Sequence, residues 1–304
     1  MNIIEHEPLA RHTSWRIGGA ARYYVEVAEA AQVQAALGWA AERELPVFVM
    51  GSGTNLLVRD GGFDGLVIRF VGREWSITPA PDGETATLHL AAGAPMAGTA
   101  RRVSAQGWGG LVWAEGLPGS LGGAVYGNAG CYGGDIAGVL TQAWLLVEDR
   151  VEVWANEQFG FGYRSSVLKR WQPPPRCPLV LAADLRLHHA DADRLRAEMA
   201  EIAAARKSKT PWGSSCGSVF KNPPPVIGAD GTATTYSAGQ IIERAGIKGT
   251  RIGGAEISVV HGNYIVNVDH ATAADVLALI ALAQRTIRAE FGIDLELEVQ
   301  VVGE

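Results

Sequence analysis

The first residues that could do chemistry form a short glycine-rich motif. The motif follows directly on Val47–Met50, an apolar run typical of a buried strand, and consists of Gly51, Ser52, Gly53, Thr54 and Asn55. Glycine lets a backbone approach a ligand closely, and consecutive N–H groups in such a turn can hold an anion. The motif matches neither the dinucleotide pattern G-x-G-x-x-G nor the phosphate loop G-x-x-x-x-G-K-[ST]. A tight turn between two strands is the alternative.

A second glycine-rich block, Gly116 to Gly130, lies near the middle of the chain. It begins with residues that include Gly116, Pro118, Gly119, Ser120 and Gly123. So many glycines cost conformational entropy, which a fold tolerates more readily where its backbone lies against a flat or phosphorylated ligand. Two such loops could hold a dinucleotide diphosphate. A close-packed turn region without a ligand is the alternative.

Two further segments carry polar side chains that could act on a bound molecule. In Tyr163–Ser166, Arg164 lies in a polar turn beside an aromatic residue, and its guanidinium could bind a carboxylate through two parallel hydrogen bonds. In Gly217–Pro223, Ser218 has no histidine nearby in sequence and no G-x-S-x-G motif, which disfavours a nucleophilic hydrolase. A surface arginine and an ordinary turn serine are the alternatives.

The acidic candidate Glu298 lies in a segment where polar and apolar residues alternate. At a period of two, one strand face carries Asp294, Glu296, Glu298 and Gln300. The simplest interpretation is that all four side chains face water, because nothing local distinguishes Glu298 from Glu296.

The composition of the chain limits the classes of function. Its 304 residues suggest two or three domains, and 47% hydrophobic with 19% charged residues is typical of a globular protein. A net charge of −6 leaves no basic field for nucleic acid or an anionic membrane. No apolar run reaches the roughly 18 residues of a membrane span. The N-terminus lacks the basic region of a signal peptide, so we expect a cytoplasmic protein.

Metal and disulfide chemistry are not indicated. Cys131, Cys177 and Cys216 lie far apart without C-x-x-C spacing, and the histidines form no H-E-x-x-H pattern, so we expect neither a disulfide framework nor a metal site. Lysine is scarce, but three of the five lysines fall within fifteen residues: Lys207, Lys209 and Lys221. This cluster could bind an anionic ligand, and a solvated helix end is the alternative.

The elements that must position these residues predict an α+β fold in three consecutive segments: 1–72, 73–190 and 191–304. The first is expected to be a β-α-β unit, the second to be rich in strands and turns, and the third to contain the strongest helices. Predicted helices cover Glu29–Glu44, Pro95–Gln106, Asp191–Lys207, a short stretch between Ser237 and Gly246, and a longer one from Thr272 to Phe291. Predicted strands cover Arg22–Val27, Val47–Met50, Leu66–Ile68, Thr85–Ala92, Ala143–Trp154, Leu179–Leu187 and Ile293–Val302. Pro173–Pro175 is expected to be a loop or an edge.

Taken together, the motifs resemble the UDP-N-acetylenolpyruvoylglucosamine reductase family, flavoenzymes of bacterial peptidoglycan precursor synthesis. The matching segments are His12–Gly19, Gly51–Val58, Gly116–Ser120, Tyr163–Ser166, Gly217–Pro223, Ser237–Glu243 and Ile252–Ala255. Each motif is weak alone, but their order is consistent over nearly the whole chain, which makes the set specific.

The resemblance implies a two-part FAD-binding region of the vanillyl-alcohol-oxidase type (1–72 and 73–190), followed by a smaller α+β substrate-binding domain (191–304). The two glycine-rich loops would hold FAD, and NADPH would be the co-substrate. The substrate would be a UDP-sugar, with no nucleic-acid or membrane partner, and a monomer is expected.

The resemblance also assigns roles to individual residues. Arg164 would bind the substrate carboxylate and stabilise the enolate, Glu298 would assist it, and Ser218 would donate a proton to C2. Further contacts to the UDP-sugar would come from Tyr163, Arg206, Lys209 and Asn222.

Two departures from the family pattern stand out. Leu297 replaces the proline that usually precedes the catalytic glutamate. The chain is also short between Arg164 and Lys209, so it resembles the compact second subtype, which lacks an inserted substrate-covering tyrosine. Two other functions stay open: an oxidase that returns electrons to oxygen, and a UDP-sugar-binding or flavin-binding protein without catalysis.

Overall fold

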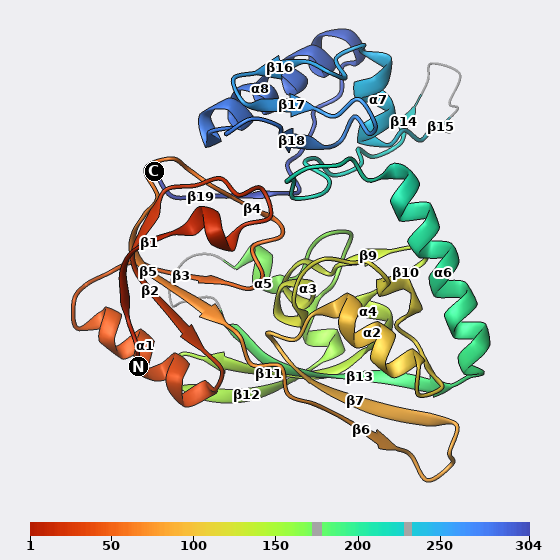
Figure 1. The fold of residues 1–304 in the computed structure, drawn as a ribbon. Helices are drawn as coiled ribbons and strands as arrows, with labels where there is room; N and C mark the ends of the chain where they lie inside the picture. Colours follow the sequence, from red (N-terminus) through yellow and green to blue (C-terminus); the bar gives the residue numbers. More distant parts are fainter. Residues whose placement is uncertain (172–177, 228–232) are drawn as a thin grey trace. The chain divides into compact units, whose positions relative to one another are not determined.

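The computed structural model describes residues 1–171, 178–227 and 233–304 (Figure 1). The expected loop at Pro173–Pro175 and the thiol of Cys177 lie outside these residues. The chain forms two compact units, each built from separate segments. Unit 1 comprises Met1–Ile3, Tyr24–Ser52 and Leu66–Ser208, and unit 2 comprises Ile4–Tyr23, Gly53–Gly65 and Lys209–Glu304. Both units contain residues of the expected segment 1–72; the three-part linear division stays a prediction.

Unit 1 is built around an antiparallel sheet with the strand order β12-β11-β13-β7-β6, and β8 also pairs with β13. These strands span β6 (Trp75–Pro79), β7 (Thr85–Ala91), β8 (Trp108–Gly109), β11 (Leu140–Val147), β12 (Arg150–Ala155) and β13 (Leu179–His189). The helices of unit 1 are α1 (Ala30–Ala41), α2 (Met96–Ser104), α3 (Leu121–Gly127), α4 (Ile136–Val139), α5 (Val167–Arg170) and α6 (Ala192–Lys209), whose last residue belongs to unit 2. Short elements complete it: η2 (Val112–Ala114), β9 (Gly130–Cys131), β10 (Gly134–Asp135) and η3 (Asn156–Phe159).

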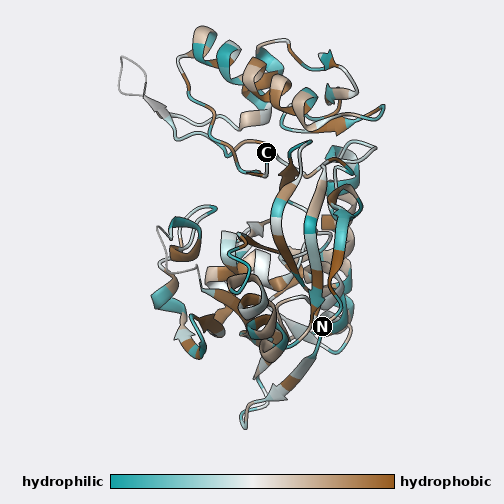
Figure 2. Ribbon diagram, turned by 90° about the vertical axis from the view of Figure 1, so that its left-hand side faces the viewer, coloured by the Kyte–Doolittle hydropathy of each residue, from teal (hydrophilic) through white to brown (hydrophobic). Residues whose placement is uncertain are grey.

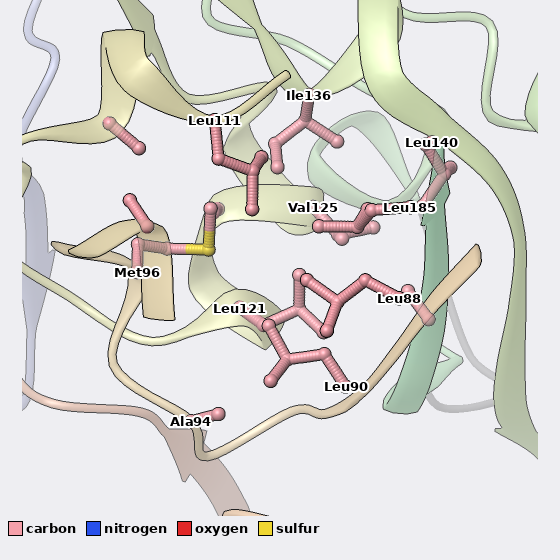
Figure 3. Close-up of a cluster of buried hydrophobic side chains, with 14 of the residues drawn as sticks. Leu88, Leu90, Ala94, Met96, Leu111, Leu121, Val125, Ile136, Leu140 and Leu185 are labelled. Atoms are coloured by element: carbon pink, nitrogen blue, oxygen red, sulfur yellow. The ribbon is translucent and has the colours of Figure 1, made fainter. Parts of the chain in front are cut away.

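The core of unit 1 forms between this sheet and the helices of the glycine-rich block. Leu121 and Val125 of α3 pack with Leu88, Leu90 and Leu185 of the sheet, and all five side chains are fully buried (Figure 3). The apolar residues of β7 and β13 alternate with polar ones, as expected for a sheet that is covered on one face. The glycine-rich block therefore carries a substantial part of the core as well as its loops.

The predicted strand Ala143–Trp154 is wrong as a single element. It is a hairpin in which β11 and β12 pair antiparallel and Val147 lies opposite Arg150. Glu148, in the connecting turn, has a φ of 53°. The two-residue turn contains neither glycine nor proline, so the sequence has no strong turn signal between the two β-rich stretches.

The glycine motif follows a strand as predicted. β3 (Val47–Met50) pairs in parallel with β5 (Phe63–Phe70), with Met50 opposite Arg69. α1 connects β2 (Ala20–Val27) to β3. The motif then lies between β3 and β4 (Leu56–Val58). The motif therefore connects two strands, a position that suits both a ligand-binding loop and an ordinary turn.

Unit 2 has a small sheet with the order β16-β17-β18 and a parallel pair of β4 with β19. Its other elements are β1 (Ile4–Pro8), η1 (Leu9–His12), β14 (Val226–Ile227), β15 (Ala233–Thr234), α7 (Ala238–Arg244), β16 (Arg251–Ile252), β17 (Ala255–Ile257), β18 (Ile265–Asn267), α8 (Ala273–Phe291) and β19 (Gln300–Val302). Ser237 and Thr272, where two of the expected helices start, both begin their helices with a full capping box. α8 contains a continuous apolar run, Val276–Ala283, and a more polar C-terminal half, and its buried face belongs to the core of unit 2 (Figure 2 colours the ribbon by hydropathy).

The predicted final strand Ile293–Val302 is regular only over β19. The preceding residues form single contacts instead, with Leu297 bridging to Phe220. The expected alternation of buried and exposed side chains is present here, because Leu295 and Val299 are buried. The segment that pairs with these residues, around Phe220, is irregular and not a strand.

Candidate active site

Gly51, the first residue of the glycine motif, lies beside the second glycine-rich block in unit 1. A Cβ on Gly51 would lie 2.4 Å from the hydroxyl oxygen of Ser120, so a larger residue fits only if the Ser120 side chain turns away. Ser120 is 3% exposed and forms a β-bridge with Pro95 at the start of α3. The two predicted loops therefore approach each other at Gly51 and Ser120.

Internal packing explains some of the predicted cofactor glycines but not all. Gly53 has a φ of +64°, and a Cβ there would meet a backbone oxygen at 1.9 Å. Gly116 has a φ of +67°, and a Cβ there would lie 2.7 Å from Cδ of Arg206. At Gly123 an added Cβ would make only ordinary van der Waals contact, with the hydroxyl of Ser120 at 3.9 Å. Close packing thus explains Gly53 and Gly116, whereas packing within the chain does not require glycine at position 123.

Arg164 occupies a tight turn that is fastened to the end of α3. Gly162 and Ser165 exchange backbone hydrogen bonds of 3.0 and 3.1 Å around it, and its φ is 52°. The amide of Asn128 donates to the Gly162 carbonyl at 3.1 Å. Ser166, which is fully buried, donates its hydroxyl to a backbone carbonyl of α3 at 2.6 Å. Positive φ in a residue other than glycine is uncommon, and it is often found at functional sites.

The predicted residues Arg164 and Arg206 both lie near the thiol of Cys131. Nη2 of Arg206 is 2.9 Å from this sulfur, and its guanidinium lies 5.1 Å from the ring centre of Tyr132. Burial raises the pKa of the Cys131 thiol, and the two guanidinium groups oppose that rise. Tyr163 stacks beside Arg164 at 5.4 Å. Unit 1 therefore brings together two cations that suit carboxylate or phosphate groups.

The segments that carry Ser218 and Glu298 are paired through their backbones in unit 2. The N–H of Glu298 donates to the carbonyl of Val219, the residue after Ser218, at 2.8 Å. The N–H of Lys221 donates to the carbonyl of Glu296 at 2.8 Å. The interpretation that all four polar residues of this segment face water is wrong for Glu298, which is partly buried, whereas Glu296 is exposed.

Two predicted ligand-binding asparagines hold the backbone of unit 2. Nδ2 of Asn55 donates to the carbonyl of Glu298 at 3.0 Å, and Asn55 accepts a bond from the N–H of Gln300 through its own carbonyl. Oδ1 of Asn222 accepts from the N–H of Ala238 at the start of α7, at 3.0 Å. Both side chains therefore have structural partners in addition to any ligand.

Lys209, the remaining predicted substrate residue, belongs to unit 2 and lies within electrostatic range of His261. A separate cavity of about 570 Å³ in unit 2 is lined by residues such as Arg16, Asp60 and His270. It contains none of the predicted site residues, and its lining mixes both charges.

The lowered pKa of His261 leads to a prediction of how stability depends on pH. Burial, together with nearby Lys248 and Lys209, holds the pKa of His261 below its usual 6.5, and Glu243 opposes this weakly. The folded chain therefore binds this proton less readily than the unfolded chain, so stability should be lost as the pH falls through about 6.5. Urea unfolding between pH 8 and pH 5 should show a steeper loss for the wild type than for His261→Asn. Parallel curves would contradict the prediction.

Several residues of the site escaped the sequence analysis. Asn128, Cys131, Tyr132 and Asn263 carry no motif that sets them apart from turn residues. Their partners lie 34 to 75 positions away in the chain, and only the fold brings them close. Cys131 and Cys216 are free thiols.

Comparison with known proteins defines the class first. An FAD-binding domain model matches residues 21–148. A second model, described as the C-terminal domain of UDP-N-acetylenolpyruvoylglucosamine reductase, matches residues 208–302. The chain is therefore an FAD-dependent oxidoreductase with an additional C-terminal domain, which confirms the expected fold class and the FAD cofactor.

Full-length relatives identify the family. The chain is 54% identical over 304 residues to UDP-N-acetylenolpyruvoylglucosamine reductase of Chloroflexus aggregans, covering 99% of this chain and 98% of the relative. It is 40% identical to the Rubrobacter xylanophilus reductase, covering 98% and 94%. The crystal structure of UDP-N-acetylenolpyruvylglucosamine reductase from Thermus caldophilus matches with a TM-score of 0.79 at 32% identity, covering 99% and 98%. The chain belongs to the UDP-N-acetylenolpyruvoylglucosamine reductase family, as the motifs predicted.

No helix within 1–171, 178–227 and 233–304 combines the length and the apolar character that crossing a bilayer requires.

Proposed function

We propose that this chain reduces the enolpyruvyl group of UDP-N-acetylglucosamine enolpyruvate to give UDP-N-acetylmuramate, with NADPH as the hydride donor, in peptidoglycan precursor synthesis. Membership of the reductase family supports this proposal. The observation that carries it is the direct backbone pairing of the segments after Ser218 and around Glu298. That pairing brings a hydroxyl-bearing and a carboxyl-bearing residue to adjacent segments of one unit.

Bound FAD would supply the hydride chemistry, because a flavin accepts a hydride from NADPH and passes it on. Addition of that hydride to C3 of the substrate moves negative charge onto its carboxylate. Arg164 binds this carboxylate and stabilises the enolate through a planar pair of N–H donors. Hydrogen bonds of Asn128 and Ser166 hold this turn on both sides, so the backbone from which the Arg164 side chain extends has a fixed position.

Proton delivery to C2 completes the reaction. Ser218 donates its hydroxyl proton to the enolate carbon, and Glu298 assists by a hydrogen bond to the enolate oxygens. A serine hydroxyl is a poor acid in water, but an enolate is a strong base, and close positioning lowers the barrier further. The product gains one hydride at C3 and one proton at C2.

The remaining predicted residues bind the substrate and the cofactor. Arg206 and Lys209 contact the diphosphate, and Asn222 and Tyr163 contact other parts of the UDP-sugar. FAD is held by Gly51, Ser52, Gly53, Thr54 and Asn55 of the first loop and by Gly116, Pro118, Gly119, Ser120 and Gly123 of the second. The close approach of Gly51 to Ser120, and a glycine at position 123 that packing within the chain does not require, support a shared backbone surface for this cofactor.

We also propose that the protein acts as a cytoplasmic monomer, without nucleic-acid or membrane partners. The net charge of −6 supports the last two points, because it gives no attraction to polyanions. The division into FAD-binding segments 1–72 and 73–190 and a substrate-binding segment 191–304 is part of the same proposal.

A visible absorbance scan tests the function. Purified protein should be yellow, NADPH should bleach it, and the enolpyruvyl substrate should restore the oxidised band in the absence of oxygen. Reoxidation by oxygen after reduction by a sugar alcohol, without NADPH, would favour an oxidase instead. Binding of NADPH without any absorbance change would favour a protein that does not catalyse.

A further inference from the structure

A buried asparagine is bonded to both backbone groups of Phe220. The N–H of Phe220 donates to Oδ1 of Asn263 at 2.9 Å, and Nδ2 of Asn263 donates to the carbonyl of Phe220 at 2.8 Å. The N–H of Val219 also donates to the backbone carbonyl of Asn263, at 2.9 Å. Asn263 is 3% exposed, and Val219 and Phe220 are equally inaccessible. A neutral amide whose acceptor and donor both bind one residue fixes that residue closely.

The same short segment is bonded on its other side to the residues around Glu298. The carbonyl of Val219 accepts from the N–H of Glu298, and Phe220 bridges to Leu297. Residues 219–221 therefore lie between Asn263 on one side and residues 296–298 on the other. Regular strand pairing does not supply this order, because neither segment has a strand partner along its full length.

Ser218 is the residue immediately before this segment, which is hydrogen-bonded on two sides. The residue before it, Gly217, has a φ of +75°, which a residue with a side chain rarely adopts. Cys216, one position earlier, is buried, and its thiol donates to the carbonyl of Leu56 at 3.3 Å. On the C-terminal side, Val219 and Phe220 are bonded through their backbone groups, and these bonds help to set the position of Ser218.

From these contacts we propose that Asn263 is a positioning residue that sets the separation between the Ser218 hydroxyl and the Glu298 carboxyl. The inference rests on the proposed function, in which these two groups act on one enolate. Asn263 does not contact the reacting atoms in this proposal. It acts by holding Val219 and Phe220, which carry Ser218 on one side and pair with Glu298 on the other.

Unit 2 offers a matched control. Asn267 also bonds two backbone groups with its amide, donating to the Trp15 carbonyl at 3.0 Å and accepting from the N–H of Ala271 at 2.9 Å. It lies four positions from Asn263 in the sequence, and, within the described part of the chain, its side-chain partners Trp15 and Ala271 form no hydrogen bond with residues 219–220 or 298. Its backbone N–H donates to the carbonyl of Ser214, and Asn267→Ser retains this bond. A purely structural asparagine should behave as Asn267 does.

The first test needs no catalysis. In FAD-loaded enzyme, Asn263→Ser should accelerate hydrogen exchange at the amides of Phe220 and Glu298 by at least tenfold, whereas Asn267→Ser should leave both within twofold of wild type. Unchanged exchange at both amides in Asn263→Ser, or equal acceleration by both variants, would overturn the proposal. If Asn263→Ser does not fold, Asn263→Asp, which keeps an oxygen facing the Phe220 N–H, takes its place.

The second test separates the two halves of the reaction. We expect Asn263→Ser to reduce flavin reoxidation by the enolpyruvyl substrate about 100-fold, as for a displacement of about 1 Å, while flavin reduction by NADPH stays within twofold. Asn267→Ser should change neither rate by more than twofold. Equal slowing of both half-reactions in Asn263→Ser would overturn the positioning role. Failure of wild-type enzyme to be reoxidised by this substrate would instead refute the proposed function, and hydrogen exchange would still decide whether Asn263 orders the two segments.

Discussion

Replacing Ser218 with alanine should leave flavin reduction by NADPH unchanged and slow flavin reoxidation by the enolpyruvyl substrate about a thousandfold. The hydroxyl is the proposed proton source for C2, and a positioned general acid typically contributes a factor of ~10² to 10⁴. Ser218 takes no part in binding FAD in this proposal, so the first half-reaction serves as an internal reference. Stopped-flow absorbance of the flavin measures both rates on one sample.

Ser215→Ala provides the control for Ser218→Ala. Ser215 lies three positions earlier in the same irregular segment and is similarly half-buried. The Ser215→Ala variant should leave the rates of both half-reactions within twofold of wild type. If Ser218→Ala slowed reduction and reoxidation equally, the variant would have damaged the site in general, and the assignment of Ser218 as the proton donor would be wrong.

Replacing Trp15 with alanine should destabilise unit 2 by about 4 kcal/mol, which is typical of truncating a large buried aromatic side chain. The Trp15 side chain is fully buried, and its indole N–H donates to the carbonyl of Ile265 at 2.7 Å. Removal leaves both a cavity and a carbonyl without its donor. Because the chain has two units, amide hydrogen exchange in α8 is the appropriate measurement, and about 4 kcal/mol corresponds to roughly a thousandfold acceleration.

Trp15→Phe keeps most of the apolar volume but loses the indole N–H and the volume of one fused ring. Its expected cost is about 1 to 2 kcal/mol, so exchange in α8 should rise about tenfold. If Trp15→Ala and Trp15→Phe accelerated exchange equally, the hydrogen bond to Ile265 rather than the buried volume would dominate, and the cavity argument would be incorrect.

Local signals predicted the elements that depend on local chemistry. The capping boxes at Ser237 and Thr272 involve residues three positions apart, so the sequence alone contains both partners. The strand Val47–Met50 and the turn after it were predicted for the same reason. The hairpin of β11 and β12 was missed because its two-residue turn contains neither glycine nor proline.

The site is harder to predict because its order comes from distant partners. Glu298 differs from Glu296 through backbone bonds to Val219 and Asn55, neither of which is near it in sequence. Arg206 meets Cys131 across 75 positions. Roles for Arg164, Ser218 and Glu298 came from the family resemblance rather than from periodicity, and these roles stay predictions until the half-reactions are measured.

The segmented construction of unit 2 has a consequence for how the protein is made. Trp15 and β4 leave the ribosome early, but the core around Trp15 and the parallel partner β19 come from the last third of the chain. Apolar residues of unit 2 near the N-terminus therefore remain exposed to solvent until the C-terminal third of the chain has been synthesised. During that interval we expect chaperones to bind the nascent chain. Premature termination before β19 would yield a product whose apolar surface stays exposed and prone to aggregation.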